Sequence, residues 1–218
     1  MADRVLTVAD AGERENLAAF LARAVRLDEA AVVRLRQRGD THVVAWAATG
    51  FETLAARVVS GRIRPQDTVV AADGLLRALR TGAEVDPGFS MDSAWRGALP
   101  PDEGFVHVDD VPARILMDLA RQGTEVAAEH AGPKGPPASL LAQEVLAVDG
   151  GGEHVVVSMR TVFALAGMGF VPGADAESAT VDPAELVRVR ASRTWLRLDA
   201  RYGSVFARRG GEIPISVL

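Results

Sequence analysis

Cysteine is absent from this chain of 218 residues. Without thiols there can be no disulfide bond, no thiolate nucleophile and no cysteine-ligated zinc or iron–sulfur site. Long apolar runs are also absent, and none approaches the roughly 20 residues that a membrane-spanning helix needs. The N-terminal segment carries acids and arginines where a signal peptide would have an apolar core. We therefore expect a cytoplasmic protein with no membrane partner.

Lysine is almost absent, because Lys134 is the only one and arginine supplies every other permanently cationic side chain. Together with abundant Ala, Val and Gly, this bias is typical of a GC-rich bacterial genome. The formal net charge is −5 at pH 7. Nucleic-acid-binding proteins obtain most of their affinity from a basic surface. Nucleic acid is therefore not expected as a partner.

Motifs that would identify an enzyme are missing as well. The sequence has no GxxxxGK[ST] phosphate loop and no GxSxG elbow, and the triplet Gly150–Gly152 lacks the strand and helix that frame a dinucleotide site. The histidines show neither HxH nor HExxH spacing: His42, His107, His130 and His154. We expect no cofactor and no metal site. The catalytic residues stay unknown, and whether the protein is an enzyme stays open.

The chain does contain similar sequence patterns in its N-terminal and C-terminal parts. Val33–Arg57 and Val187–Arg208 both begin with alternating apolar and Arg residues, continue through Thr into an apolar run, turn at a Gly and end on Ala-Arg. Thr68–Gly82 and Val155–Gly169 each place a short Val run before a small helix. The predicted fold class is α+β. It has antiparallel sheets built from two pseudo-repeated units, each a β-meander plus a β–helix unit, with flanking helices.

Periodicity, caps and turn residues predict the individual elements. The expected helices are Glu13–Leu27, Asp73–Thr81, Val111–His130 and Arg160–Met168. The expected strands of the first half are Val5–Val8, Ala31–Gln37, Thr41–Ala48, Thr53–Ser60 and Thr68–Ala71. Those of the second half are Leu140–Val148, Glu153–Ser158, Leu186–Ala191, Trp195–Ala200, Ser204–Arg209 and Ile213–Leu218.

A Pro- and Gly-rich stretch, Gly82–Gly104, interrupts this pattern and is predicted to be a long connection or a partly ordered lid. Within it, Trp95 and Arg96 are candidates for an interface or ligand contact, although Trp95 could simply pin the loop to the core. We expect a single domain over residues 1–218. Its pseudo-symmetric halves would be 1–82 and 105–218, joined by the connection 83–104.

Arginine alternates with apolar residues in two of the predicted strands, at Arg34 and Arg36 and again at Arg188 and Arg190. Because side-chain direction has a period of two, each pair lies on one face. If the two strands were neighbours, four guanidinium groups would share a surface suited to an acidic partner or a phosphate. We favour the alternative of a solvated face neutralised by Asp and Glu.

The segment 195–202 resembles a ligand site more than any other. It would set Trp195, Arg197 and Asp199 along one strand face, with Arg201 further along and Tyr202, the only tyrosine, at the adjoining turn. Such a cluster could hold a small ligand by stacking and bidentate hydrogen bonds. An Arg197–Asp199 pair on an exposed strand, with a Trp that covers a neighbour, is the alternative.

One family resemblance exists at the level of topology. The order strand, helix, three-stranded meander, strand, helix over about Val5–Gly82 resembles half of a processivity-clamp domain. The run TGFETLAARVVSGRIRPQDTVVAADGLLRAL is similar in rhythm to that family's stretch leading into its second helix. The resemblance covers about a third of the chain and contains no diagnostic residue. It implies several such domains around a ring, with basic helices facing inward.

Three functional hypotheses follow. The main one is a non-catalytic interaction or accessory protein, a homodimer or the partner of another protein, acting through a sheet face or the Gly82–Gly104 loop. The second is a small-molecule-binding protein or enzyme with its site at 195–202. The third is a DNA-associated clamp-like module, to which the topology alone points, since a fold does not by itself carry a function.

Overall fold

The computed structural model describes residues 4–129, 136–173 and 181–210. The first half contains β1 (Val5–Val8), α1 (Ala11–Leu27), β2 (Val32–Arg38), β3 (His42–Ala48), β4 (Leu54–Arg64), β5 (Asp67–Ala71), α2 (Ala72–Ala78) and β6 (Glu84–Val85). A short 3-10 helix, η1 (Asp92–Ala94), lies in the connection. The second half contains β7 (Val106–Pro112), α3 (Ala113–Glu129), α4 (Ala138–Ala142), β8 (Glu144–Gly150), β9 (Glu153–Ser158), α5 (Met159–Gly167), β10 (Leu186–Ala191), β11 (Trp195–Ala200) and β12 (Gly203–Arg208).

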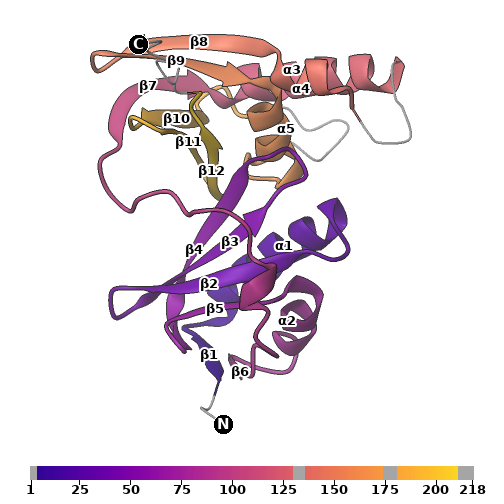
Figure 1. Cartoon of the computed structure of the whole chain (residues 1–218), viewed down its shortest axis with the longest axis vertical. Helices are drawn as coiled ribbons and strands as arrows, with labels where there is room; N and C mark the ends of the chain where they lie inside the picture. Colours follow the sequence, from indigo (N-terminus) through magenta and orange to yellow (C-terminus); the bar gives the residue numbers. More distant parts are fainter. Residues whose placement is uncertain (1–3, 130–135, 174–180, 211–218) are drawn as a thin grey trace, which may run out of the picture.

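One antiparallel sheet runs the length of the molecule, in the order β5-β2-β3-β4-β12-β11-β10-β7, with the helices gathered against one of its faces (Figure 1). β1 continues it beside β4 and β6, while β8 and β9 form a separate hairpin. The two halves meet where β4 pairs with β12, through Leu54–Ala56 and Ser204–Phe206. The predicted α+β class, with antiparallel sheets and repeated β–helix units, is confirmed.

The two halves match element by element about this joint. The meander β2-β3-β4 lies on one side and β10-β11-β12 on the other, and each is flanked by one further antiparallel strand, β5 or β7. Each half adds a small antiparallel pair, β1 with β6 or β9 with β8, and two helices in mutual contact, α1 with α2 or α3 with α5. In the first half β5 and α2 follow the meander, whereas in the second half their counterparts β7 and α3 precede it.

Local chemistry explains the principal helix of the first half. Asp10 caps α1 by accepting a hydrogen bond from the Glu13 amide at 2.9 Å. Its buried residues recur at helical spacing and face the sheet: Leu17, Phe20, Leu21 and Ala24. The strands of the sheet alternate between this core and the opposite face, so Val33 and Leu35 of β2 are fully buried under the helices.

Some predictions about individual elements are wrong. Val106–Pro112 is a strand, although Asp109, Asp110 and Pro112 are typical of a helix start, and His107 consequently lies on β7. Residues 140–142, predicted as the start of a strand, belong to the helix α4. Through the sheet, β5 and α2 correspond to β7 and α3 instead of to the β9–α5 unit that the similar sequence patterns suggest. The predicted strand Ile213–Leu218 and His130 lie outside the described residues. In the described part of the chain, no helix is long and apolar enough to cross a membrane.

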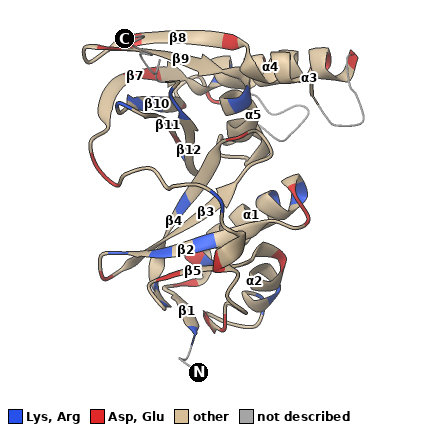
Figure 2. Cartoon of the chain, in the orientation of Figure 1, with Lys and Arg blue, Asp and Glu red and all other residues tan. Residues whose placement is uncertain are grey.

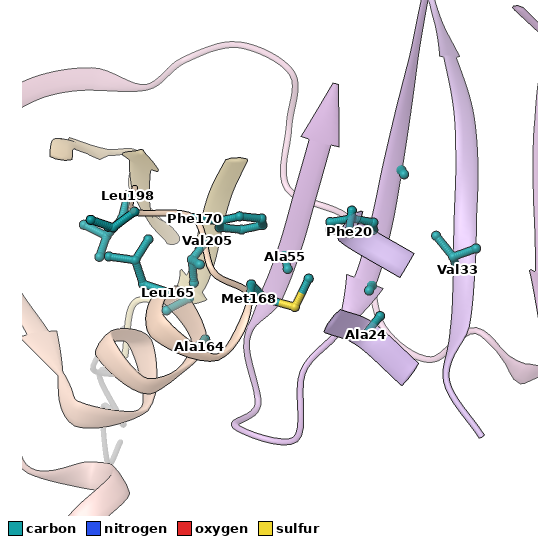
Figure 3. Close-up of a cluster of buried hydrophobic side chains, with 14 of the residues drawn as sticks. Phe20, Ala24, Val33, Ala55, Ala164, Leu165, Met168, Phe170, Leu198 and Val205 are labelled. Carbon is teal, nitrogen blue, oxygen red and sulfur yellow. The ribbon is translucent and has the colours of Figure 1, made fainter. Parts of the chain in front are cut away.

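The hydrophobic core is continuous across the joint between the halves (Figure 3). The ring of Phe20 on α1 stacks on that of Phe170, which follows α5, with centroids 6.3 Å apart. Phe170 also lies against Gly203, where an added Cβ would stand 2.5 Å from the Phe170 ring. A glycine at this position therefore lets the aromatic pair pack against β12.

Replacing Phe170 with alanine should destabilise the whole protein, because this side chain is 2% exposed and contacts both halves. We expect a loss of about 3–5 kcal/mol in the free energy of unfolding, measured by urea denaturation. Ile115→Ala on α3, where the side chain is 40% exposed, is the control and should cost about 1 kcal/mol or less. Equal effects of the two substitutions would contradict a core shared across the joint.

Candidate functional site

The face of the sheet opposite the helices carries a second apolar cluster. Its buried members come from four strands on both sides of the joint: Val44, Trp46, Ala56, Trp195 and Phe206. Residues of the connection between the halves pack on this cluster, namely Trp95, Leu99 and Phe105. The connection, which we call the strap (residues 86–105), therefore crosses the face of the sheet that the helices leave uncovered.

The strap is fixed to the edge strand β5 by hydrogen bonds. The Val69 amide donates to the Asp92 carboxylate at 2.8 Å, and the Met91 amide donates to the Val69 carbonyl oxygen at 2.8 Å. The indole of Trp95 donates to the Gly97 carbonyl oxygen at 3.1 Å, and the Arg34 guanidinium lies 5.9 Å from its ring centroid. Trp95 thus pins the strap to the sheet, and Arg96 beside it is exposed.

The alternating arginines do share this face, but they are not neighbours, because four strands separate β2 from β10. Arg34 forms a two-pronged ion pair with Asp67 at 2.7 Å, and that hydrogen bond raises the pKa of Arg34. Arg188 contacts Asp110 at 3.2 Å. Arg190 contacts Asp199 at 3.3 Å. Three of the four are therefore neutralised by aspartate, and Arg36 is exposed without a carboxylate partner in the described part of the chain.

Beside the joint, β4 changes its strand partner and leaves an opening. On the side away from β3, β4 pairs with β12 through Leu54–Ala56 and with β1 through Gly61–Arg64. Between these two pairings, none of the described strands pairs with Arg57–Val59 on that side. The opening faces the turn between β11 and β12, at Arg201 and Tyr202. We call it the sheet gap. It opens into a cavity of about 340 Å³.

Most of the predicted site residues line this cavity. Arg197, Asp199, Arg201 and Tyr202 do so, together with Arg38, Arg57, Trp46 and Phe206 from other strands and Glu13 from α1. Trp195 lies outside it, under the Arg208 guanidinium at 4.1 Å. Trp95 and Arg96 lie in the strap, apart from the cavity. The cluster of 195–202 is thus divided between a cavity wall and the apolar cluster on the sheet face.

The charged residues of the predicted cluster are already paired. The Asp199 carboxylate accepts from Arg197 at 2.6 Å, and Arg190 lies at 3.3 Å. Arg201 forms a bidentate ion pair with the buried carboxylate of Glu185, at 2.6 and 2.9 Å, which raises the pKa of Arg201. These groups build the cavity wall and are held in place by one another.

Arg57 is the residue that the sequence analysis missed. Its guanidinium donates to the Tyr202 carbonyl oxygen and lies 5.6 Å from the Tyr202 ring centroid, but no carboxylate forms an ion pair with it among the described residues. Burial lowers its pKa, and the nearby Glu13 carboxylate acts in the opposite direction. The only signal in the sequence is an arginine at a core-facing position of β4, between Ala55 and Val59.

Charges of both signs are intermixed over the molecule (Figure 2). Helices α1 to α5 carry seven arginines against six carboxylates, a formal charge of +1 in a chain of net charge −5. Arg114 on α3 and Arg80 directly after α2 are exposed and form no ion pair in the part of the chain that the structure describes. No group of three or more His, Asp or Glu among the described residues could hold a metal ion.

Comparisons with known families and curated proteins give no function. The model of a family described as a domain of unknown function, DUF8185, matches residues 100–212. A second domain of unknown function, DUF8010, matches residues 1–97. None of the curated proteins matches the chain.

Solved structures, in contrast, show a consistent likeness. The DNA polymerase sliding clamp from Bacillus subtilis superposes with a TM-score of 0.59 at 13% identity, over 98% of this chain and 66% of the clamp chain. A putative DNA polymerase III beta subunit from Eubacterium rectale gives 0.56 at 12%, over 97% and 66%. The beta sliding clamp of C. crescentus gives 0.56 at 15%, over 97% and 66%. The chain thus has the fold of a sliding clamp over 66% of a clamp chain's length.

This likeness corrects the inference from net charge. The prediction that nucleic acid is not a partner is wrong, because the fold is that of DNA polymerase sliding clamps. Net charge sums over the whole chain, whereas binding depends on the face that meets the ligand. Of the three hypotheses, the clamp-like module is better supported than the accessory protein that we took as the main one.

Replacing Asp92 with alanine should loosen the strap, because its carboxylate accepts the Val69 amide that ties the strap to β5. We expect faster cleavage by trypsin after Arg96, which offers the only tryptic bond in the strap, with Asp102→Ala as the control. Hydrogen bonds from Ser90 and then Val69 lower the pKa of Asp92, so this anchor is present at neutral pH and is lost as pH falls through that lowered pKa. Equal cleavage rates in the two variants would contradict the anchoring role.

Proposed function

The chain belongs to the DUF8185 family of domains of unknown function, and from that premise and its clamp-like fold we propose that it is a DNA-associated, sliding-clamp-like protein. The observation that carries the proposal is the continuous sheet of two matched halves with helices against one face. This is the arrangement that superposes on sliding clamps over 97–98% of the chain. The proposal assigns no enzymatic reaction to the protein.

The helix layer is the face that we assign to DNA. Its helices carry a formal charge of +1, whereas the whole chain carries −5. It also presents exposed guanidinium groups at Arg80 and Arg114 that form no ion pair among the described residues. Guanidinium groups that neutralise phosphates give a sequence-independent affinity that falls steeply with salt. The opposite face is partly covered by the strap, and some of its arginines, including Arg34 and Arg188, are paired with aspartate.

Charge reversal on the helix layer should weaken DNA binding. We expect duplex DNA to bind in a salt-sensitive manner in fluorescence anisotropy, and Arg80→Glu and Arg114→Glu each to lower the affinity by about tenfold, because each substitution turns an attraction for phosphate into a repulsion. Arg36→Glu is the matched control, since Arg36 is also exposed and unpaired but lies on the opposite face. Absence of salt-sensitive binding, or an equal loss in the control, would overturn the assignment.

We further propose that the functional form contains two copies. The chain spans 66% of the clamp chains it matches, so one copy supplies less of such a structure than one clamp chain does. Its two ends both expose apolar side chains. Phe89 is 91% and Met91 38% exposed beside β5, and at the other end Val106 of β7 and Leu186 of β10 are 45% and 47% exposed. A head-to-tail contact between two copies would bury both sets.

Sedimentation at micromolar concentration tests this assembly. We expect a dimer, and we expect Phe89→Ser to raise its dissociation constant because that substitution removes the most exposed apolar side chain at one end. Val58→Ser is the control, because Val58 is 43% exposed but lies on β4 in the middle of the sheet. A strict monomer in the unmodified protein would exclude the homodimer.

A further inference from the structure

The sheet gap is the basis of an inference that is independent of DNA. We propose that it binds a small phosphorylated ligand of mononucleotide size, whose phosphate is held by Arg57, while Arg38, which also lines the cavity, adds positive charge to it. Nothing in the clamp-like proposal requires this site, because its residues lie beside the joint of the sheet and not on the exposed arginines assigned to DNA.

The cavity has the size and position of a ligand site. Its volume of about 340 Å³ lies within the range of roughly 300–1,000 Å³ that small-molecule sites occupy, and it is too large for a phosphate ion alone. It is lined from both faces of the sheet, by Glu13 and Asn16 of α1 on one side and by Trp46 and Phe206 on the other. The cause is structural, since β4 has no strand partner between Ala56 and Gly61 on this side.

Arg57 supplies the principal anion contact. A guanidinium group has five N–H donors, and within the described residues the one hydrogen bond of this group goes to the Tyr202 carbonyl oxygen. The group is partly desolvated, and burial lowers its pKa. A ligand oxyanion would use the remaining donors and compensate the buried positive charge, which is the setting in which charge-assisted hydrogen bonds are strongest.

The other charges of the cavity leave a positive balance around the gap. Arg38 is exposed and has no ion pair among the described residues. Arg197 and Arg190 share the single carboxylate of Asp199. Arg201 is matched by Glu185. Two carboxylates oppose an anion here, Asp102, which is exposed, and Glu13, which accepts a hydrogen bond from Ser60 at 3.2 Å.

The remaining volume suits a planar ring. Tyr202 lines the cavity and is 41% exposed, and Trp46, which is 6% exposed, also contributes to the lining. Aromatic side chains stack on nucleobases without regard to base identity. The chemical class that combines a phosphate with such a ring is the nucleoside monophosphate. A ligand here would contact both halves of the chain, since β4 belongs to one half and Tyr202 to the other.

Isothermal titration of the full chain with adenosine monophosphate tests the site, with inorganic phosphate and adenosine as separate arms. We expect saturable binding of the monophosphate, weaker binding of phosphate and none of adenosine. Arg57→Gln should weaken binding by about tenfold or more, because a charge-assisted hydrogen bond is lost. Arg36→Gln, which removes a charge from the sheet face opposite the helices and outside the cavity, should bind like the unmodified protein. Arg57→Gln should leave the affinity for duplex DNA unchanged.

A gain of affinity provides the sharpest check. Glu13→Gln removes a negative charge from the cavity wall and should tighten binding of the monophosphate several-fold. If Arg57→Gln does not fold, Arg38→Gln decides, because Arg38 is exposed and its loss should still weaken binding. No saturable binding at millimolar ligand, equal binding of adenosine, or unchanged affinity in both Arg57→Gln and Arg38→Gln would overturn the proposal. Weaker binding in Glu13→Gln would overturn it as well.

Discussion

A short antiparallel ladder, Leu54–Ala56 of β4 against Ser204–Phe206 of β12, makes one sheet out of two halves. Its register determines which side chains of both meanders face the helices, because a slip of one residue would move every side chain to the other face. With this register, Ala55 and Val205 lie in the core, while Ala56 and Phe206 lie on the opposite face. The stacked Phe20 and Phe170 then extend the same core across the joint.

Matched elements lie on both sides of this ladder, and the match fails where β4 continues past the joint. Beyond the joint, β4 continues to Arg64 and pairs with β1, whereas β12 ends at Arg208 and its counterpart pair, β8 and β9, forms a separate sheet. Beside the prolonged β4, the turn after β11 has no strand to pair with. The sheet gap, with the half-buried Arg57, therefore lies where the symmetry between the two halves is broken.

Local patterns predicted most of this fold and little of the site. The apolar–Arg alternation of the two meanders depends on neighbours in sequence, so β2, β3 and β10 to β12 were predicted to within one residue at each end. β4 was predicted to end at Ser60 but extends to Arg64. β7 was missed because Asp109, Asp110 and Pro112 have the composition of a helix start, and pairing with β10 overrides that local preference. The partners of Arg57 and Arg201, at Tyr202 and Glu185, depend on tertiary contacts that no periodicity encodes.

The pairing of charges, more than their sum, determines what this surface can bind. Arg34 and Arg188 are neutralised across the sheet by Asp67 and Asp110, so the alternation that stands out in the sequence contributes little free positive charge. Among the described residues, Arg36 of this alternation is unpaired, and further unpaired guanidinium groups lie at the sheet gap and on the helix layer, where in the sequence they look like any other arginine. A net charge of −5 therefore coexists with two separate places where a phosphate would meet positive charge. Because the two proposed sites use different arginines, a small phosphorylated ligand and a DNA backbone would not compete for the same guanidinium groups.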